Sequence, residues 1–284
     1  TLFRSSEVDR FDLQSSNYRH AGPWRLESAK ETNIWNRVSQ ASKNFSYYVK
    51  EMNRSITTGI NKVFVGKKKY FEEKGIEPDL IRPLCRAKSV RSHHLRHTSD
   101  YIVFPYNKTN SGVEPVDLKN YPGAKSYFEK HRRELLDRGW YGDTVEEAEM
   151  LWYGFLYVSQ SILEQKILFP KIASEARFAS DRSGDVVLLE PAYLATTDCV
   201  IEDDYILACL NSSLITSKLR KETTTLSGGY LELQVQYVKR LPIRTIPFTT
   251  PEDERDAHTE TTIAAYEAAR DADADPTANA VVER

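Results

Sequence analysis

Short apolar runs bounded by glycine or proline alternate along this chain with longer stretches whose apolar residues recur at helical spacing. The runs DYIVFPY at 100–106 and QKILFPKI at 165–172 are largely apolar, and each contains Phe-Pro near its end. Such runs predict strands, and since proline cannot donate to a sheet ladder, each strand should stop there or lie at an edge. A run at 63–65 between two glycines predicts another short strand, and DRSG at 181–184 predicts the turn of a hairpin over 177–197.

Four stretches have the pattern of helices. Apolar residues recur at helical spacing across 34–49, and a charged amphipathic pattern covers 124–139, where a glycine ends it. In 203–221 the leucines share one face, with acids at the front and bases at the rear, as the helix dipole favours. A last helix should take Thr250 as its cap and Pro251 in its first turn, and then give way to a disordered DADADPTAN segment.

A pair of glycines, Gly228 and Gly229, precedes the run LELQVQYV and a Leu-Pro-Ile exit. Glycine permits positive φ and lets another backbone or a ligand approach closely. Along the strand predicted here, Gln234 and Gln236 alternate on one side. A loop that faces a phosphate or a base edge is one interpretation of the segment, and a plain turn into a half-exposed strand is the other.

These elements together indicate an α+β fold, in which a mixed β-sheet body with packed helices has helical flanks at both ends. We divide the chain into a helical lead-in or linker at 1–56, a body at 57–247 and an acidic helical tail with a disordered end at 248–284. The length of 284 residues suffices for one large domain or two modest ones.

Charge is unevenly divided along the chain. The net charge is −2, yet residues 251–284 hold ten acids and three bases, which leaves the rest of the chain at +5. Within 61–108 there are eleven Lys and Arg against five acids, so a nucleic-acid surface is permitted there. Three cysteines, no apolar run of about 18 residues and no secretory signal pattern indicate a cytoplasmic protein without a membrane span.

Eight segments in a fixed order carry a resemblance to a known family. They are GINKVFVG, DLIRPLCRAKSV, YIVFPY, YPGAKSYFEKHRRELLDR, WY, QKILFPKI, YILACLNSSL and GGYLELQVQYVKRLPI. In this order, over about residues 57–245, the chain resembles the TaqI-like C-terminal specificity domain. That domain is the target-recognition part of N6-adenine DNA methyltransferases and of fused restriction–modification enzymes.

In that family the recognition domain follows a catalytic domain that binds S-adenosylmethionine. This chain has no Pro-Pro dipeptide, so it lacks the Asn/Asp-Pro-Pro-Tyr/Phe signature of adenine methylation, and it has no Gly-x-Gly. The resemblance therefore implies a sequence-specific DNA recognition module of a type II restriction–modification system, used in phage defence, with no catalytic residue of its own. It would position duplex DNA for a methyltransferase domain in cis or in trans, where S-adenosylmethionine is expected. The chain does not begin with Met, which suggests a piece of a longer protein.

The resemblance also implies that the basic segment and the glycine loop contact DNA. Lysines would neutralise phosphates, whereas arginine and glutamine can bind base edges bidentately. The expected DNA-binding residues are Lys62, Lys67, Lys68, Lys69, Arg86, Lys88, Arg91, Arg96, Ser227, Gly228, Gly229, Tyr230 and Gln234. Which of them read bases stays open, and a solvated surface position is the alternative for each.

The sequence allows three other interpretations. A cysteine and three histidines fall within 85–97, but they lack the Cys-x-x-Cys spacing of a structural zinc site, and no metal is expected. Glu164 and Lys166 have the spacing of the distal half of a Mg²⁺-dependent nuclease motif. In a protein-interaction scaffold, the aromatic cluster at 140–157 and the acidic tail would be the working surfaces.

Overall fold

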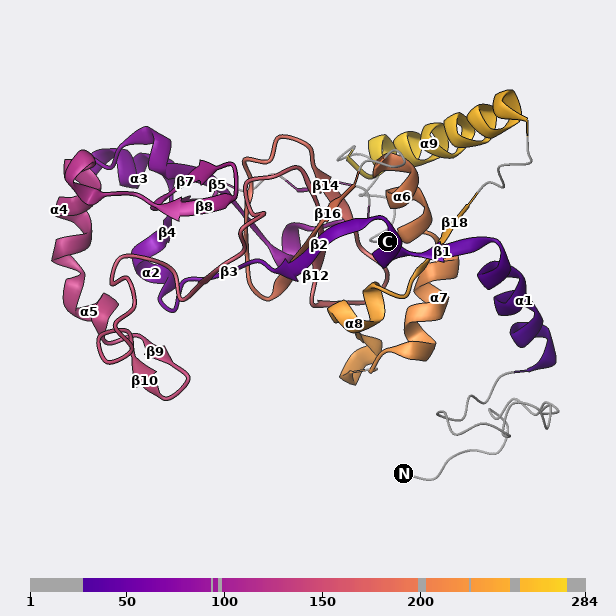
Figure 1. The fold of residues 1–284 in the computed structure, drawn as a ribbon, viewed down its shortest axis with the longest axis horizontal. Helices are drawn as coiled ribbons and strands as arrows, with labels where there is room; N and C mark the ends of the chain where they lie inside the picture. The colour runs from indigo at the N-terminus through magenta and orange to yellow at the C-terminus, as the bar shows by residue number, and fades with distance from the viewer. Residues whose placement is uncertain are drawn as a thin grey trace, which may run out of the picture.

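Two hydrophobic cores lie on opposite faces of one four-stranded sheet in the computed structural model. The structure describes residues 28–92, 94–96, 99–198, 203–224, 226–245 and 251–274. We call the part around the core that contains Phe64 and Phe104 the first lobe, and the part around the core that contains Phe45 and Phe178 the second lobe. The molecule is elongated (Figure 1). Helices α3 (Lys68–Glu73), α4 (Pro122–Lys130) and α5 (Arg132–Leu136) lie at one end, and α1 (Ala29–Gln40) and α9 (Glu252–Ala274) at the other.

The sheet between the cores is antiparallel, with strand order β14-β12-β16-β2. Its strands are β2 (Val49–Arg54), β12 (Lys166–Pro170), β14 (Ala179–Asp181) and β16 (Ala192–Thr197). Side chains alternate between the faces of a strand, so Leu168, opposite Leu194, enters the first core, whereas Ile167 and Phe169 enter the second. Every residue of β12 is buried, which explains its continuous apolar run.

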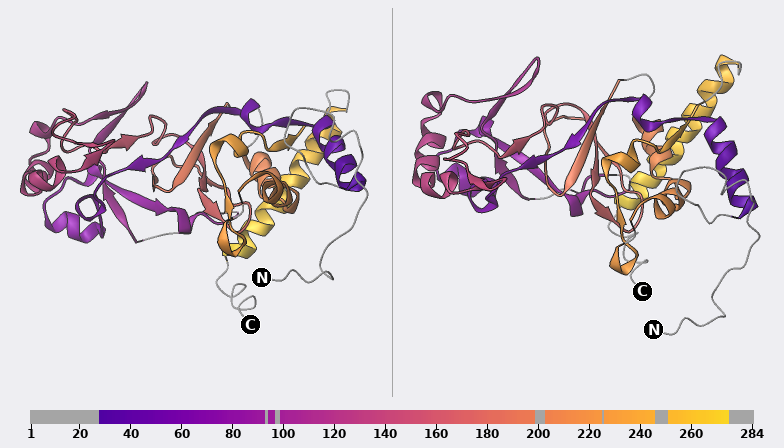
Figure 2. Two further views of the ribbon diagram at one scale, coloured as in Figure 1. Left: turned by 90° about the horizontal axis from the view of Figure 1, so that it is seen from below. Right: turned by 60° about the horizontal axis from the view of Figure 1, so that its bottom comes forward.

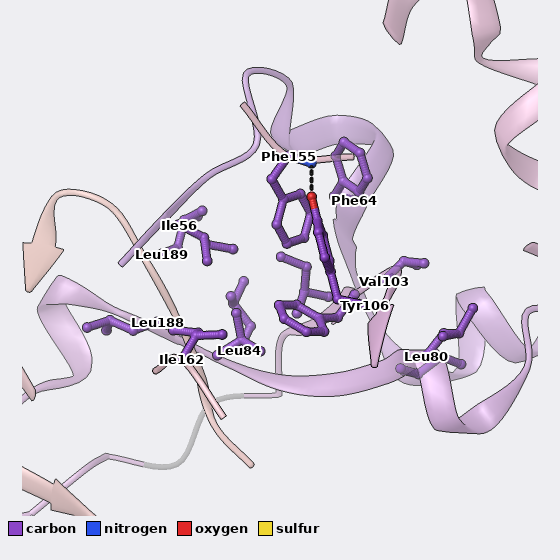
Figure 3. Close-up of a cluster of buried hydrophobic side chains, with 14 of the residues drawn as sticks. Ile56, Phe64, Leu80, Leu84, Val103, Tyr106, Phe155, Ile162, Leu188 and Leu189 are labelled. Carbon is purple, nitrogen blue, oxygen red and sulfur yellow. Dashed lines mark hydrogen bonds between the residues drawn. The ribbon is translucent and has the colours of Figure 1, made fainter. Parts of the chain in front are cut away.

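A six-stranded mixed sheet, with order β11-β3-β15-β5-β6-β4, supports the first core. Its strands are β3 (Ile56–Thr57), β4 (Val65–Gly66), β5 (Ile81–Arg86), β6 (Tyr101–Val103), β11 (Tyr157–Val158) and β15 (Val187–Leu189), with β15 parallel to β3 and β5. The helices of this lobe are α2 (Asn61–Phe64), α3 (Lys68–Glu73), α4 (Pro122–Lys130) and α5 (Arg132–Leu136). Inside the core, the Phe155 N–H donates to the Tyr106 hydroxyl at 2.7 Å, beside Phe64 (Figure 3).

Two hairpins extend the first lobe. They are β7 (Tyr106–Thr109) with β8 (Gly112–Pro115), and β9 (Gly139–Trp140) with β10 (Asp143–Thr144). Short 3-10 helices connect elements in both lobes: η3 (Phe45–Tyr47), η4 (Pro78–Leu80), η5 (Ala87–Ser89), η6 (Leu118–Asn120) and η7 (Ser227–Gly229).

The second lobe is mainly helical. It contains α6 (Asp203–Leu210), α7 (Ser213–Glu222) and α8 (Val235–Val238), and two small antiparallel pairs, β1 (Ser42–Asn44) with β18 (Pro242–Arg244) and β13 (Ile172–Ala173) with β17 (Leu231–Glu232). Helices α1 (Ala29–Gln40) and α9 (Glu252–Ala274) flank this lobe at the same end of the molecule (Figure 2). In the part of the chain that the structure describes, no helix is long and apolar enough to cross a bilayer.

The predicted α+β architecture, with mixed sheets, packed helices and helical flanks, is confirmed. The strands predicted before the two Phe-Pro pairs are also confirmed: β6 stops one residue before Phe104, and β12 ends at Pro170. Each strand thus ends near the residue that cannot continue a ladder.

Three predicted helices are wrong in extent. The helix expected over 34–49 ends at Gln40, and the chain then forms strands of the sheets, because pairing with β18 and β16 outweighs the local helical spacing. The helix expected over 124–139 breaks at His131 into α4 and α5. The one expected over 203–221 divides into α6 and α7 at Ser212, whose hydroxyl accepts from the Ile215 N–H at 3.3 Å as an N-cap.

Two predicted β features also differ from the structure. The chain turns after Asp181, but β14 and β15 belong to different sheets and do not pair as a hairpin. The Asp181 carboxylate accepts from the N–H groups of Gly184 and Val186, each at 3.1 Å, so side-chain bonds form this turn. Of the strand predicted at 63–65, only the last residue is extended, since α2 includes the first two.

The acidic tail begins as a helix after Pro251, as predicted. Helix α9 continues to Ala274, so the start of the segment predicted to be disordered is helical. The expected cap, Thr250, and residues 275–284 lie outside the described residues.

Helix α4 begins where two backbones approach closely. The Glu77 carboxylate accepts from the N–H groups of Gly123 at 2.8 Å and Ala124 at 2.9 Å, and a Cβ on Gly123 would lie 1.7 Å from the Gly75 carbonyl oxygen. We expect Gly123→Ala to lower the free energy of unfolding by about 1–3 kcal/mol, because the backbone has to shift. Urea denaturation measures this, and Gly139→Ala, whose Cβ would meet nothing within 4 Å, is the matched control. Equal midpoints for the two variants would contradict the expectation.

Candidate functional site

The carboxylate of Asp100 binds two of the predicted DNA-binding cations of the first lobe, Lys67 and Arg86. Asp100, just before β6, accepts from Lys67 Nζ at 3.0 Å on Oδ1 and from Arg86 Nε at 3.1 Å on Oδ2. Lys67 also donates to the Ser99 hydroxyl. These two cations, the Lys67 hydrogen bond first, hold the pKa of Asp100 below its usual range, although partial burial acts in the opposite direction. The cluster therefore has two positive charges on one negative charge.

The other predicted lysines of this segment also face acids. Lys62 pairs with Glu134 of α5 at 2.6 Å. Lys68 and Lys69 pair with the residues four positions later, Glu72 at 3.8 Å and Glu73 at 3.9 Å. All three lysine side chains are more than half exposed. Exposed pairs of this kind contribute about 0–1 kcal/mol, so these lysines can exchange an acid for another anion at little cost.

Lys88, Arg91 and Arg96 lie in and after η5. The segment closes on itself through the bridge between Val90 and Leu95, the Arg91 N–H to the His94 carbonyl at 3.0 Å, and the Arg96 N–H to the Ser89 carbonyl at 2.9 Å. No ion pair joins these three cations to another residue within the described ranges. Two histidines of this segment, His93 and His97, lie outside the described part of the chain. We call residues 88–96 the basic loop.

The glycine loop, residues 227–230, belongs to the second lobe. Gly228 and Gly229 have φ of +78° and +77°, which only glycine adopts readily, and the Leu226 N–H donates to the Tyr230 carbonyl at 2.7 Å. Ser227 and Tyr230 are exposed. The loop is therefore a tight, exposed turn that leads into β17.

The strand predicted after this turn is wrong beyond Glu232. Gln234 is the N-cap residue of α8 and Gln236 lies inside that helix, so the two do not alternate along a strand. Their side chains instead bond each other at 2.8 Å. The run of period two was too short to distinguish a strand from one helical turn.

The basic loop of the first lobe contacts the second lobe. The Ser92 hydroxyl donates to the Ala176 carbonyl at 3.5 Å, and the Ala176 N–H donates to the Thr216 hydroxyl of α7 at 3.0 Å. The predicted residues thus fall into three groups: Lys67 with Arg86 around Asp100, the cations of the basic loop, and the glycine loop with Gln234. Lys62, Lys68 and Lys69 are near Lys67 in the sequence, but they pair with acids other than Asp100.

Asp100 itself was not predicted from the sequence. It is the only acidic residue between Asp79 and Glu114, in a stretch otherwise rich in bases. A solitary acid among bases is the signal that could have identified it.

The residues of the nuclease interpretation do not form a metal site. Lys166 is buried and its ammonium bonds Asp181 at 2.6 Å, whereas the Glu164 carboxylate faces Lys50 at 3.9 Å. Among the described residues, no group of three His, Cys, Asp or Glu side chains could hold a metal ion. Lys166 and Asp181 form a core ion pair.

Much of the aromatic cluster at 140–157 is part of the first core. Phe155 is buried, and the Tyr153 hydroxyl donates to the Val116 carbonyl at 2.7 Å. Trp152 packs on that core, and the Arg132 guanidinium lies over its ring, 4.5 Å from the centroid. These three side chains stabilise the lobe, whereas Tyr141 of the same cluster is exposed.

The family model of the TaqI-like C-terminal specificity domain matches residues 82–243, and the chain belongs to this family. The match confirms the resemblance and includes Arg86, Asp100, the basic loop and the glycine loop. Residues 62–69 precede the matched range.

Curated relatives are type II methyltransferases. The chain is 26% identical over 229 residues to "Type II methyltransferase M.PaeR7I" of Pseudomonas aeruginosa, which covers 78% of this chain and 37% of that protein. It is 21% identical over 227 residues to "Type II methyltransferase M.XhoI" of Xanthomonas vasicola, covering 78% of this chain and 39% of that protein. The chain thus spans less than two fifths of the length of these two relatives.

Two solved structures share the fold. The type IIL restriction–modification enzyme MmeI, solved in complex with DNA, aligns with a TM-score of 0.55 and 15% identity over 80% of this chain and 29% of its own. The type IIG restriction endonuclease BpuSI aligns with a TM-score of 0.54 and 14% identity over 84% of this chain and 27% of its own.

Proposed function

We propose that this chain is the sequence-specific DNA recognition module of a restriction–modification N6-adenine methyltransferase. Membership of the specificity-domain family is the observation that carries the proposal. The type II methyltransferase relatives, of which the chain spans only a part, support a second, catalytic domain outside this segment. That domain, in cis or in trans, would bind S-adenosylmethionine, take the adenine out of the stack and methylate it.

The module would act by binding alone. Exposed lysines whose acidic partners hold them weakly, such as Lys68 and Lys69, would neutralise phosphates and fix the register of the duplex. The basic loop, in which Lys88 and Arg96 are exposed, and the exposed glycine loop come from different lobes, so together they would contact successive parts of a duplex. This role fits a cytoplasmic protein of phage defence.

Duplex DNA binding at several salt concentrations tests the proposal. A linear fall of log K against log salt is expected, with a slope of about −0.9 for each neutralised phosphate. Alanine at Lys67, Lys68 and Lys69 should flatten the slope by about 0.9 for each phosphate that the variant no longer neutralises.

Alanine at Lys119, Lys125 and Lys130 is the matched control, since it removes the same charge from exposed positions of the same lobe. An equal change of slope in the two variants would show that the first three lysines act only through net charge. No duplex binding by the unmodified chain, with a discrete protein partner recovered instead, would overturn the proposed function in favour of a scaffold.

A further inference from the structure

We propose that Arg86 reads a guanine in the DNA target and that Asp100 is the positioning residue that aims its guanidinium. The inference rests on the proposed function and makes it specific, because it separates one base-reading residue from the phosphate-binding cations around it.

The contact between Arg86 and Asp100 leaves the two terminal nitrogens of the guanidinium available. Asp100 Oδ2 takes only Nε of the guanidinium, at 3.1 Å. The two terminal nitrogens make no hydrogen bond or ion pair with the other described residues, and 35% of the side chain is exposed. A planar fork with both terminal nitrogens unused matches the O6 and N7 acceptors of guanine in the major groove.

The mixed sheet holds the backbone of both residues of this pair. Arg86 is the last residue of β5 and lies opposite Leu189 of the parallel strand β15. Asp100 precedes β6, which pairs with β5, and its carbonyl accepts from the Leu84 N–H at 3.0 Å. Strands fix side-chain positions more accurately than loops do, so the guanidinium is oriented before DNA arrives.

Lys67, the third residue of the cluster, would bind a phosphate and not a base. Its ammonium occupies the other oxygen of Asp100 and its side chain is 61% exposed. An ammonium is a point charge without a planar fork, so it suits a phosphate next to the base that Arg86 would read. With two cations on one carboxylate, the cluster keeps a positive charge that attracts DNA.

The other arginines of this region lack the same geometry. Arg82, on the same strand, uses its terminal NH1 on Asp185 at 3.4 Å, and its guanidinium lies 5.7 Å from the Phe104 ring centroid. Arg91 and Arg96 have no described carboxylate to orient them. Arg86 therefore combines a fixed orientation with an unused fork.

Selection from a pool of randomised duplexes, followed by sequencing, tests the assignment with the full 284-residue chain. The unmodified chain should enrich a motif that contains a G·C pair. Arg86→Lys keeps the charge but loses the fork, and should reduce the preference at that single pair by about 10- to 100-fold while the other positions persist. Asp100→Asn should relax the same pair by about tenfold, since its amide holds the guanidinium more weakly.

Asp185→Asn, which removes the carboxylate that faces Arg82, is the matched control and should leave the motif unchanged. A uniform loss of affinity with the motif intact in Arg86→Lys would assign Arg86 to a phosphate and overturn the guanine contact. A relaxed motif in Arg86→Lys with an unchanged one in Asp100→Asn would remove the positioning role of Asp100.

A second measurement changes the DNA and begins with the unmodified chain. Replacing the guanine of the selected pair with 7-deazaguanine removes its N7 acceptor, and should weaken binding of the unmodified chain by about tenfold. The same replacement should have little effect on Arg86→Ala. Equal losses in both proteins would contradict the guanine contact. If the unmodified chain binds no duplex, or binds without preference, the proposed function fails, which is distinguishable from these outcomes.

Discussion

Replacing Asp181 with alanine is expected to lower the free energy of unfolding by about 3–5 kcal/mol, because it leaves a buried ammonium without its counter-charge. The side chains of Lys166 and Asp181 are 0% and 2% exposed, and their charged atoms lie 2.6 Å apart. Without Asp181, the Lys166 ammonium would keep only the Glu164 carbonyl, at 3.1 Å. The carboxylate also accepts from Ser183 and Gly184 in the turn that follows β14, so the variant loses that turn as well.

The loss of unfolding free energy in Asp181→Ala should depend on pH in a defined direction. Burial lowers the pKa of Lys166, and the Asp181 charge partly opposes this. In the variant the folded-state pKa falls further, so the unfolded chain binds more protons between that pKa and the ordinary pKa of lysine. Stability of the variant therefore rises with pH across this window. Because its pKa is lowered further than in the unmodified protein, the deficit should shrink as the pH is raised toward the ordinary pKa of lysine, about 10.4.

Urea denaturation at several pH values measures both effects. The double variant Lys166→Met with Asp181→Asn is the control, since it removes both charges, keeps an acceptor for the turn and fills the lysine position. It should be more stable than Asp181→Ala, because an apolar replacement of a buried pair is tolerated better than the loss of one partner. A single variant as stable as the unmodified protein would mean that water reaches the pair.

Arg138→Ala is expected to reduce the free energy of unfolding by about 3–5 kcal/mol, since each buried carbonyl left without a donor costs about 1–3 kcal/mol and water can recover only part of the total. Arg138 is 4% exposed and donates to four carbonyls rather than to a carboxylate. The acceptors are Leu135 at 2.8 Å, Thr58 at 2.7 Å, Gly154 at 2.8 Å and Trp152 at 2.8 Å.

This guanidinium joins segments that are distant in the sequence. It connects the end of α5 to the residue after β3 and to the loop at 152–154, and it lies 5.6 Å from the Phe64 ring centroid. Burial lowers the pKa of Arg138 to about 10, so the group still carries its charge at neutral pH. Arg138→Lys should recover only part of the loss, because one ammonium cannot donate in four fixed directions.

Thermal and urea denaturation of Arg138→Ala measure the effect. The matched control is Arg133→Ala in α5, where the side chain is 81% exposed and pairs with Asp137 at 3.1 Å. That change should stay within about 0.5 kcal/mol of the unmodified protein. A similar loss in both variants would mean that the carbonyl contacts of Arg138 contribute nothing beyond an ordinary surface position.

The parts of the fold that could be predicted from the sequence are those with a local cause. Strand β12 was predicted because burial on both faces requires a continuous apolar run, and α9 because Pro251 marks its first turn. The strands at 42–54 could not be predicted as such, since only pairing with β18 and β16, about 140 to 200 residues away, decides their state. The division between β14 and β15 depends likewise on partners in two sheets.

The candidate site was predictable to a similar degree. The partners of Lys68 and Lys69 follow from spacing, because residues four apart share a helix face. The meeting of Lys67, Arg86 and Asp100 does not follow from spacing, since three strands of the mixed sheet have to bring them together. Gln234 follows the glycine loop closely in the sequence, as predicted, but it is the N-cap residue of α8 and not part of a strand.

The four-stranded sheet packs against a different core on each face, and this limits which segments can be exchanged between relatives by recombination. A gene fusion that joined the first lobe of one relative to the second lobe of another would need β12 and β16 to fit two foreign surfaces at once, because their alternate side chains belong to both cores. Exchange of an exposed turn such as 227–230 disturbs neither surface. Recombination between relatives should therefore succeed at turns of this kind and fail at junctions inside the sheet.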